Sequence, residues 1–133
     1  MATIQKFEDL EVWKKARILS DKVYPLTFKE PISSDFRIKD QMRGSIGSIM
    51  DNIAEGFERG TRAEFIQFLG YAKGSCGELR SQLYRSIDRN YISAEVFEEL
   101  KTLVSQISGL IQNFILYLQN SEVSGIRKKV ASK

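Results

Sequence analysis

The sequence predicts an all-α protein, an antiparallel up-and-down four-helix bundle. Turn-forming residues divide the 133 residues into four long segments. Within each segment apolar residues recur at the three- and four-residue spacing of a helix, and no useful length of chain alternates as a strand would. The connections are short, so consecutive helices should run antiparallel. We expect helices at residues 7–27, 34–58, 62–89 and 94–119.

The first helix should end at the proline pair Pro25 and Pro31, because proline lacks the helical N–H donor and does not fit a helix interior. The next break falls at Glu58-Arg-Gly60-Thr61. Between these breaks one face of the second helix is apolar and should face the core: Met42, Ile46, Ile49, Met50, Ile53 and Phe57.

The third and fourth helices each begin with a capping residue. Thr61 and Glu64 form a capping box, and Ser93 can cap the fourth helix in a similar way. The predicted core arc of the third helix is Phe65, Phe68, Leu69, Ala72, Cys76, Leu79, Leu83 and Ile87. The fourth helix has two apolar rows, which together can touch two neighbours: Val96, Leu100, Leu103, Ile107, Leu110, Phe114 and Leu118, and Phe97, Val104, Ile111 and Leu118. We interpret Cys76 as a small core residue rather than a reactive thiol.

Charge divides the chain into a neutral body and a basic tail. Residues 1–120 hold 16 basic and 16 acidic side chains, and we expect them to form the bundle as one domain. Residues 121–133 carry the whole positive excess and should form a solvated, flexible tail. The excess comes from Arg127, Lys128, Lys129 and Lys133 against Glu122.

The same composition predicts a cytoplasmic protein. No apolar run approaches the roughly 18 residues of a membrane span, so no membrane contact is expected. The N-terminal residues lack the pattern of a signal peptide, and the single cysteine cannot form an internal disulfide.

Small residues on the second and third helices are unusual. Gly44 and Gly47 each cost a helix interior up to about 1 kcal/mol relative to alanine, and the third helix gathers Gly70, Gly74, Gly77 and Ser81 on one side. Close approach of another helix, within the bundle or between subunits, would compensate for this cost. The predicted contact residues are Gly44, Ser48, Asn52, Glu55, Gly74, Ser75 and Glu78.

The polar members of this set have two interpretations. Asn52, Glu55, Ser75 and Glu78, with Arg43, could form a hydrogen-bonded network between packed helices. The same side chains could instead line a small-ligand pocket. We prefer the network, because polar residues inside helix contacts usually specify register.

Catalysis is not expected, and neither a metal nor a cofactor is predicted. The chain contains no histidine, which removes the Ser-His and Cys-His nucleophile pairs and most transition-metal sites. The glycines of the third helix are not followed by the Gly-Lys-Ser/Thr of a phosphate-binding loop. Binding is therefore the favoured class of function.

A basic stripe on the third helix offers a hint of nucleic-acid binding. Arg62, Lys73 and Arg80 project within about 20° of one another, with Tyr84 and Tyr91 close to the same line. In such a stripe the cations can contact phosphates and the aromatic rings can stack on bases. An ordinary solvated helix face would carry a similar stripe.

Three segments carry a resemblance to a known family: FEDLEVWKKA (7–16), QMRGSIGSIMDNIAEGFERG (41–60) and EFIQFLGYAKGSCGELRSQL (64–83). They resemble the four-helix-bundle proteins encoded in intervening sequences of bacterial 23S ribosomal RNA genes. The resemblance implies assembly as a homopentamer. A related branch is similar to the accessory variability protein of diversity-generating retroelements, a basic pentamer that binds nucleic acid and a reverse transcriptase.

The sequence departs from the usual family pattern at two positions of the second helix. Arg43 stands without the second arginine that the family often has, and Met50 replaces a proline. The first change weakens the expectation of a family-like basic surface, and the second leaves a more regular helix.

We therefore expect a cytoplasmic, homo-oligomeric and non-catalytic binding or scaffold protein, associated with RNA or with an RNA-processing protein. Binding through phosphate contacts should weaken steeply with salt. The candidate contacts are Arg43, Arg59, Arg62, Lys73, Arg80 and Arg85. The alternative is a protein-protein interaction module that docks a partner on an oligomeric ring without binding nucleic acid.

Overall fold

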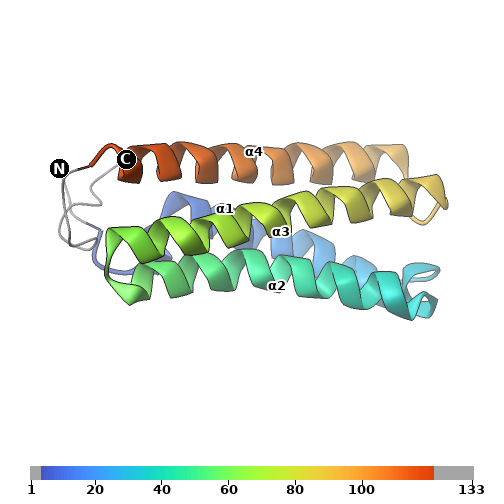
Figure 1. Cartoon of the computed structure of the whole chain (residues 1–133). Coiled ribbons are helices and arrows are strands. Elements are labelled where there is room, and N and C mark those ends of the chain that lie inside the picture. Colours follow the sequence, from blue (N-terminus) through green and yellow to red (C-terminus); the bar gives the residue numbers. More distant parts are fainter. Residues whose placement is uncertain (1–3, 122–133) are drawn as a thin grey trace.

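The computed structural model describes residues 4–121, which form four antiparallel helices packed side by side (Figure 1). Each helix contacts the next one along the chain, and α1 also contacts α4, so the four helices enclose one core. The predicted all-α, four-helix fold is confirmed. The predicted tail at 121–133 lies outside the described residues, apart from its first residue. The helices are α1 (Glu11–Val23), α2 (Phe36–Arg59), α3 (Arg62–Asp88) and α4 (Ala94–Gln119), with short 3-10 helices η1 (Phe7–Asp9), η2 (Tyr24–Phe28) and η3 (Ile32–Ser34).

The predicted caps of α3 and α4 are confirmed. The backbone N–H of Glu64 donates to Thr61 Oγ1 at 3.3 Å, and the Thr61 hydroxyl donates to the Glu64 carboxylate at 2.8 Å. At α4 the backbone N–H of Val96 donates to Ser93 Oγ at 3.1 Å. The two bonds from backbone N–H groups satisfy donors that have no partner inside the helix, and they explain why both helices begin where the sequence predicted. The Glu64 carboxylate accepts from the Thr61 hydroxyl and not from a backbone N–H as in a full capping box.

Two other residues set the limits of α2. Asp35 accepts a hydrogen bond from the backbone N–H of Ile38 at 3.3 Å and one from the Tyr91 hydroxyl at 2.9 Å. The Asp35 side chain therefore caps α2 and joins its beginning to the α3–α4 turn. Gly60 ends α2 with a φ of +86°, a left-handed conformation that glycine adopts without steric cost.

The predicted first helix is shorter than expected and begins later. Only Glu11–Val23 of the expected 7–27 is α-helical, and the remainder forms η1 and η2. Leu10 has an extended backbone, with a ψ of 127°, which separates η1 from α1. Pro25 stands in the first turn of η2, where its missing N–H does least harm, so the chain tightens into a 3-10 helix there.

The core is a single apolar cluster to which all four α-helices contribute. Phe57 and Phe65 are both fully buried and pack edge to face, with ring centroids 5.8 Å apart. On α4 the row of Phe97, Val104 and Ile111 is buried. Among residues 4–121 no helix is long and apolar enough to cross a membrane.

Candidate functional site

Hydrogen bonds between small polar side chains form a seam between α2 and α3. Ser45 Oγ donates to Gln82 Oε1 at 3.0 Å, and the hydroxyl oxygens of Ser48 and Ser75 lie 2.8 Å apart. Asn52 donates to the backbone oxygen of Ser48 at 2.8 Å and to its hydroxyl oxygen at 2.9 Å. Ser45, Ser75 and Gln82 are buried. Of the predicted network, Asn52 and Ser75 are therefore found in the seam, while Ser45, Ser48 and Gln82 are additional members.

Glu55, Glu78 and Arg43 do not belong to this network. Glu55 binds Arg59 of its own helix at 2.7 Å, and Glu78 is exposed at the edge of a depression in the surface. Arg43 points to the opposite flank of α2, where its Nε donates to Thr27 Oγ1 at 2.8 Å. Helical spacing placed these residues near the seam, but it does not determine which side of α2 receives α1 and which receives α3.

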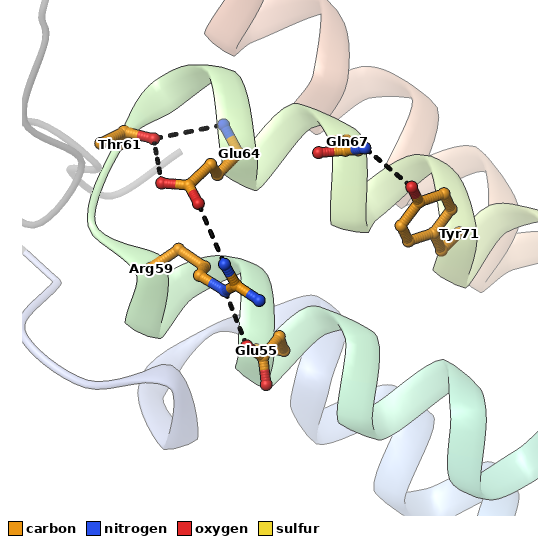
Figure 2. Close-up of polar contacts among 6 residues, drawn as sticks. All are labelled: Glu55, Arg59, Thr61, Glu64, Gln67 and Tyr71. Carbon is orange, nitrogen blue, oxygen red and sulfur yellow. Dashed lines mark hydrogen bonds and ion pairs between the residues drawn. The ribbon is translucent and has the colours of Figure 1, made fainter.

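A second group of polar contacts lies at the α2–α3 turn (Figure 2). Arg59 extends between the two helices, with Nε bound to Glu55 and Nη1 bound to Glu64 of α3 at 3.2 Å. The hydrogen bond to Glu55 is the largest reason why the pKa of the Arg59 guanidinium is raised. Arg59 thus stabilises the turn. Because its charge is already paired with two carboxylates, it is a weaker candidate for a phosphate contact.

The predicted glycine contacts are not found among residues 4–121. A Cβ atom added at Gly44 or Gly74 would meet no atom within 4 Å. The within-bundle half of the prediction is therefore wrong for these glycines, while their role between subunits stays a prediction. The same open space lies over Gly47, Gly70 and Gly77.

The close helix contact occurs instead at Gly56. A Cβ atom there would lie 2.8 Å from the Cβ of Phe68 and 3.0 Å from a ring carbon of Phe65. Both aromatic residues belong to α3 near the turn. Gly56 stands inside the family-like segment 41–60, but helical spacing alone does not distinguish it from the other glycines of α2.

A shallow depression of about 440 Å³ lies along the outer side of the seam. Ser45 and Gln82 border it, and Arg85 Nη1 donates to Gln41 Oε1 at 2.8 Å beside it. Of the four residues considered for a small ligand, the depression includes only Glu78. The lining residues are Gln41, Gly44, Ser45, Glu78, Ser81, Gln82 and Arg85.

The basic stripe of α3 is only partly available for binding. Lys73 and Arg80 make no ion pair or hydrogen bond with any residue that the structure describes, and Arg80 is exposed. Arg62 is half-buried, and its Nη1 atom is buried without a hydrogen-bond partner in the described part of the chain.

The two tyrosines of the predicted stripe have other contacts. Tyr84 remains 47% exposed, but its ring packs against the edge of Phe97 on α4 at 5.0 Å. Tyr91 follows the end of α3 and donates its hydroxyl to Asp35. The stripe therefore lies along the α4 side of α3, and Tyr91 is not part of it.

Cys76 is a core residue, as predicted, with 1% of its surface exposed. Burial raises the pKa of its thiol to about 12, because the charged thiolate is poorly solvated in an apolar interior. No group of three acidic or cysteine side chains that could hold a metal ion is present within residues 4–121.

The structure defines a class: a small four-helix-bundle protein with a polar seam between its second and third helices. The chain belongs to the 23S rRNA-intervening sequence protein family, whose model matches residues 8–113. A comparison with curated proteins finds no match.

The fold is also similar to a solved structure. This is the crystal structure of a protein of unknown function from the S23 ribosomal protein family of Bacteroides thetaiotaomicron. The two chains are 26% identical, with a TM-score of 0.72, over 78% of this chain and 97% of that chain. The resemblance inferred from the three sequence segments is confirmed.

Proposed function

We propose that this protein is a non-catalytic, cytoplasmic RNA-associated scaffold that acts as a homopentamer. Membership of the 23S rRNA-intervening sequence protein family supports an association with ribosomal RNA. The observation that carries the proposal is the pair of cations on α3, Lys73 and Arg80, which have no carboxylate partner among residues 4–121. By contrast, Lys22 forms an ion pair with Glu99 at 2.8 Å, and Lys15, Arg59 and Lys101 also form ion pairs with carboxylates.

Self-assembly is supported by the open glycines of α2 and α3. Glycine lowers helix stability relative to alanine by up to about 1 kcal/mol, and in the described part of the chain no neighbour fills the space over Gly44 or Gly74. A helix of another subunit could lie close against such a surface. Multi-angle light scattering tests this: a pentamer is expected, and a monomer at micromolar concentration would contradict it.

Salt dependence tests the RNA association. Binding of a structured ribosomal RNA fragment should weaken steeply between low and moderate salt, because each phosphate contact releases condensed counterions. Lys73→Gln combined with Arg80→Gln should lower the slope of log affinity against log salt by about 1.5. The matched control, Lys14→Gln with Lys22→Gln, removes the same charge from α1 and should leave the slope nearly unchanged.

The alternative is a protein-interaction module, and the depression beside the seam favours it. Its wall contains both a donor, Arg85, and an acceptor, Glu78, which suit a polar partner surface. Capture from a nuclease-treated lysate separates the two functions. A partner protein retained without RNA, together with a flat salt response for RNA, would favour the module over RNA association.

A further inference from the structure

Three exposed aromatic rings lie where α1 passes into α2, at the end of the bundle opposite the α2–α3 turn (Figure 1). Tyr24 is 47% exposed, Phe28 60% and Phe36 69%. Phe36 and Phe28 are the two most exposed large apolar side chains among residues 4–121. The Tyr24 and Phe28 rings meet edge to face, with centroids 5.0 Å apart. This contact fixes the two rings relative to each other while both side chains stay exposed.

Two cations of α2 lie on the faces of these rings. The Arg43 guanidinium carbon is 4.3 Å from the centroid of Phe28 and 5.1 Å from that of Tyr24. The Lys39 ammonium lies 4.5 Å from the centroid of Phe36. All three are distances at which a cation is attracted to a ring face. We call these five residues, Tyr24, Phe28, Phe36, Lys39 and Arg43, the aromatic end.

Among residues 4–121, Arg43 also has no counter-ion. It is half-buried, and a hydrogen bond from its Nε to Thr27 fixes the direction of the side chain. Neither of its Nη groups bonds to any residue that the structure describes. A partly desolvated guanidinium is stabilised by an anion, and its planar fork matches a phosphate. The open donors of Arg43 therefore indicate an anionic ligand next to the rings.

We propose that the aromatic end binds single-stranded RNA, with bases stacked on the rings and a phosphate bound by Arg43. The proposal rests on the RNA association proposed above and names the kind of RNA and the surface. Single-stranded RNA supplies both an anion and flat ring faces. A duplex hides its base faces, so it cannot use the rings.

The local charge makes a distinctive prediction. Residues 24–43 contain four basic side chains and three acidic ones, so the electrostatic part of binding at this end is small. Substitutions of the rings should weaken binding while the salt slope stays constant. Substitutions of Lys73 and Arg80 should instead lower the slope. These opposite signatures separate the aromatic end from the stripe on α3.

The test is fluorescence anisotropy with a labelled single-stranded oligoadenylate of about 12 nucleotides, within the site sizes of single-strand binders, and with a blunt-ended RNA duplex. Phe28→Leu and Phe36→Leu should each weaken oligoadenylate binding roughly 5-fold to 100-fold, which is the usual effect of losing one stacked base. Tyr71→Leu is the matched control, because Tyr71 is 51% exposed on α3 away from this end. It should change binding by less than about twofold, a surface-substitution effect.

Arg43→Lys provides a second variant, which keeps the charge but removes the planar fork, and it should also weaken oligoadenylate binding. Circular dichroism and urea unfolding establish that each variant is folded. If wild-type protein binds oligoadenylate and the ring variants bind equally well, the aromatic end is not the site, while RNA association stands. Equal losses for the duplex would overturn stacking. If the wild type binds neither RNA at low salt, the RNA association fails and this inference fails with it.

Discussion

Replacement of Gly56 by alanine should destabilise the protein, although alanine is the better helix former. The added Cβ would lie 2.8 Å from the Cβ of Phe68, which is 0.6 Å less than the 3.4 Å at which ordinary contact begins. Phe68 Cβ is attached directly to the backbone of α3, so a change of rotamer cannot relieve the clash. The two helices would have to separate near their turn.

The size of the effect follows from two opposing terms. Overpacking of a tight contact costs typically about 1–3 kcal/mol, and the gain in helix propensity offsets up to about 1 kcal/mol of this. We expect a net loss of about 1 kcal/mol, which would lower the melting temperature by about 4 °C for a chain of this size.

Urea unfolding at fixed protein concentration measures the change, with the m-value as a check that the two-state behaviour is preserved. Gly109→Ala is the matched control, because Gly109 is an exposed glycine of α4 with no atom within 4 Å of an added Cβ. This control should gain up to about 1 kcal/mol. A Gly56→Ala protein as stable as the wild type would refute the reasoning.

Three further predictions concern the buried thiol, the cap of α2 and the seam. Cys76 should resist thiol reagents until the chain unfolds. Because the pKa of its thiol rises from 9.0 to about 12 in the folded chain, its contribution to stability is complete below pH 9.0 and is lost as pH rises toward 12. Rapid labelling of the native protein would show that the thiol is accessible. Asp35→Ala should lower the urea midpoint by more than Tyr91→Phe, because it removes the cap as well as the hydrogen bond. The largest cause that holds the pKa of Asp35 below 3.8 is the hydrogen bond from the backbone of α2, followed by that from Tyr91. The wild type should therefore keep the stabilisation from the charged Asp35 above pH 3.8 and lose it as pH falls through the native pKa. Asp35→Ala should lack this response. Ser45→Ala should cost about 1–3 kcal/mol, because it leaves the Gln82 carbonyl buried without its donor; a cost within the error of urea unfolding would show that this bond contributes nothing.

Helix positions were predictable wherever the local signals agreed with one another. The second, third and fourth helices were expected at 34–58, 62–89 and 94–119, within two residues of the observed ends. A capping box, a capping serine and long apolar rows marked these helices independently. The first helix lacked a capping side chain, and its apolar pattern continued into η1 and η2, whose backbone differs from an α-helix although the side chains still reach the core.

The candidate site was predictable in chemistry but not in geometry. Small polar residues on α2 and α3 correctly indicated a polar helix contact, which Ser48 and Ser75 make. The position of Arg43 could not be inferred, because its hydrogen-bond partner Thr27 belongs to a 3-10 turn at the end of the predicted helix 7–27. Gly56 was missed because crowding depends on which residues of the neighbouring helix lie opposite, and periodicity carries no information about that.

The two-residue connection between α2 and α3 has a consequence for how this family can vary in length. The hydrogen-bonded pairs between α2 and α3 follow one another along the two helices, at increasing distance from the turn: Arg59 with Glu64, Ser48 with Ser75, Ser45 with Gln82, and Gln41 with Arg85. If one residue inserted between α2 and α3 were taken up by extending either helix, it would rotate every pair out of alignment by about 100°, including those at the far end. Length changes should therefore be rare at this turn in natural relatives and more common between α1 and α2, where the connection is longer.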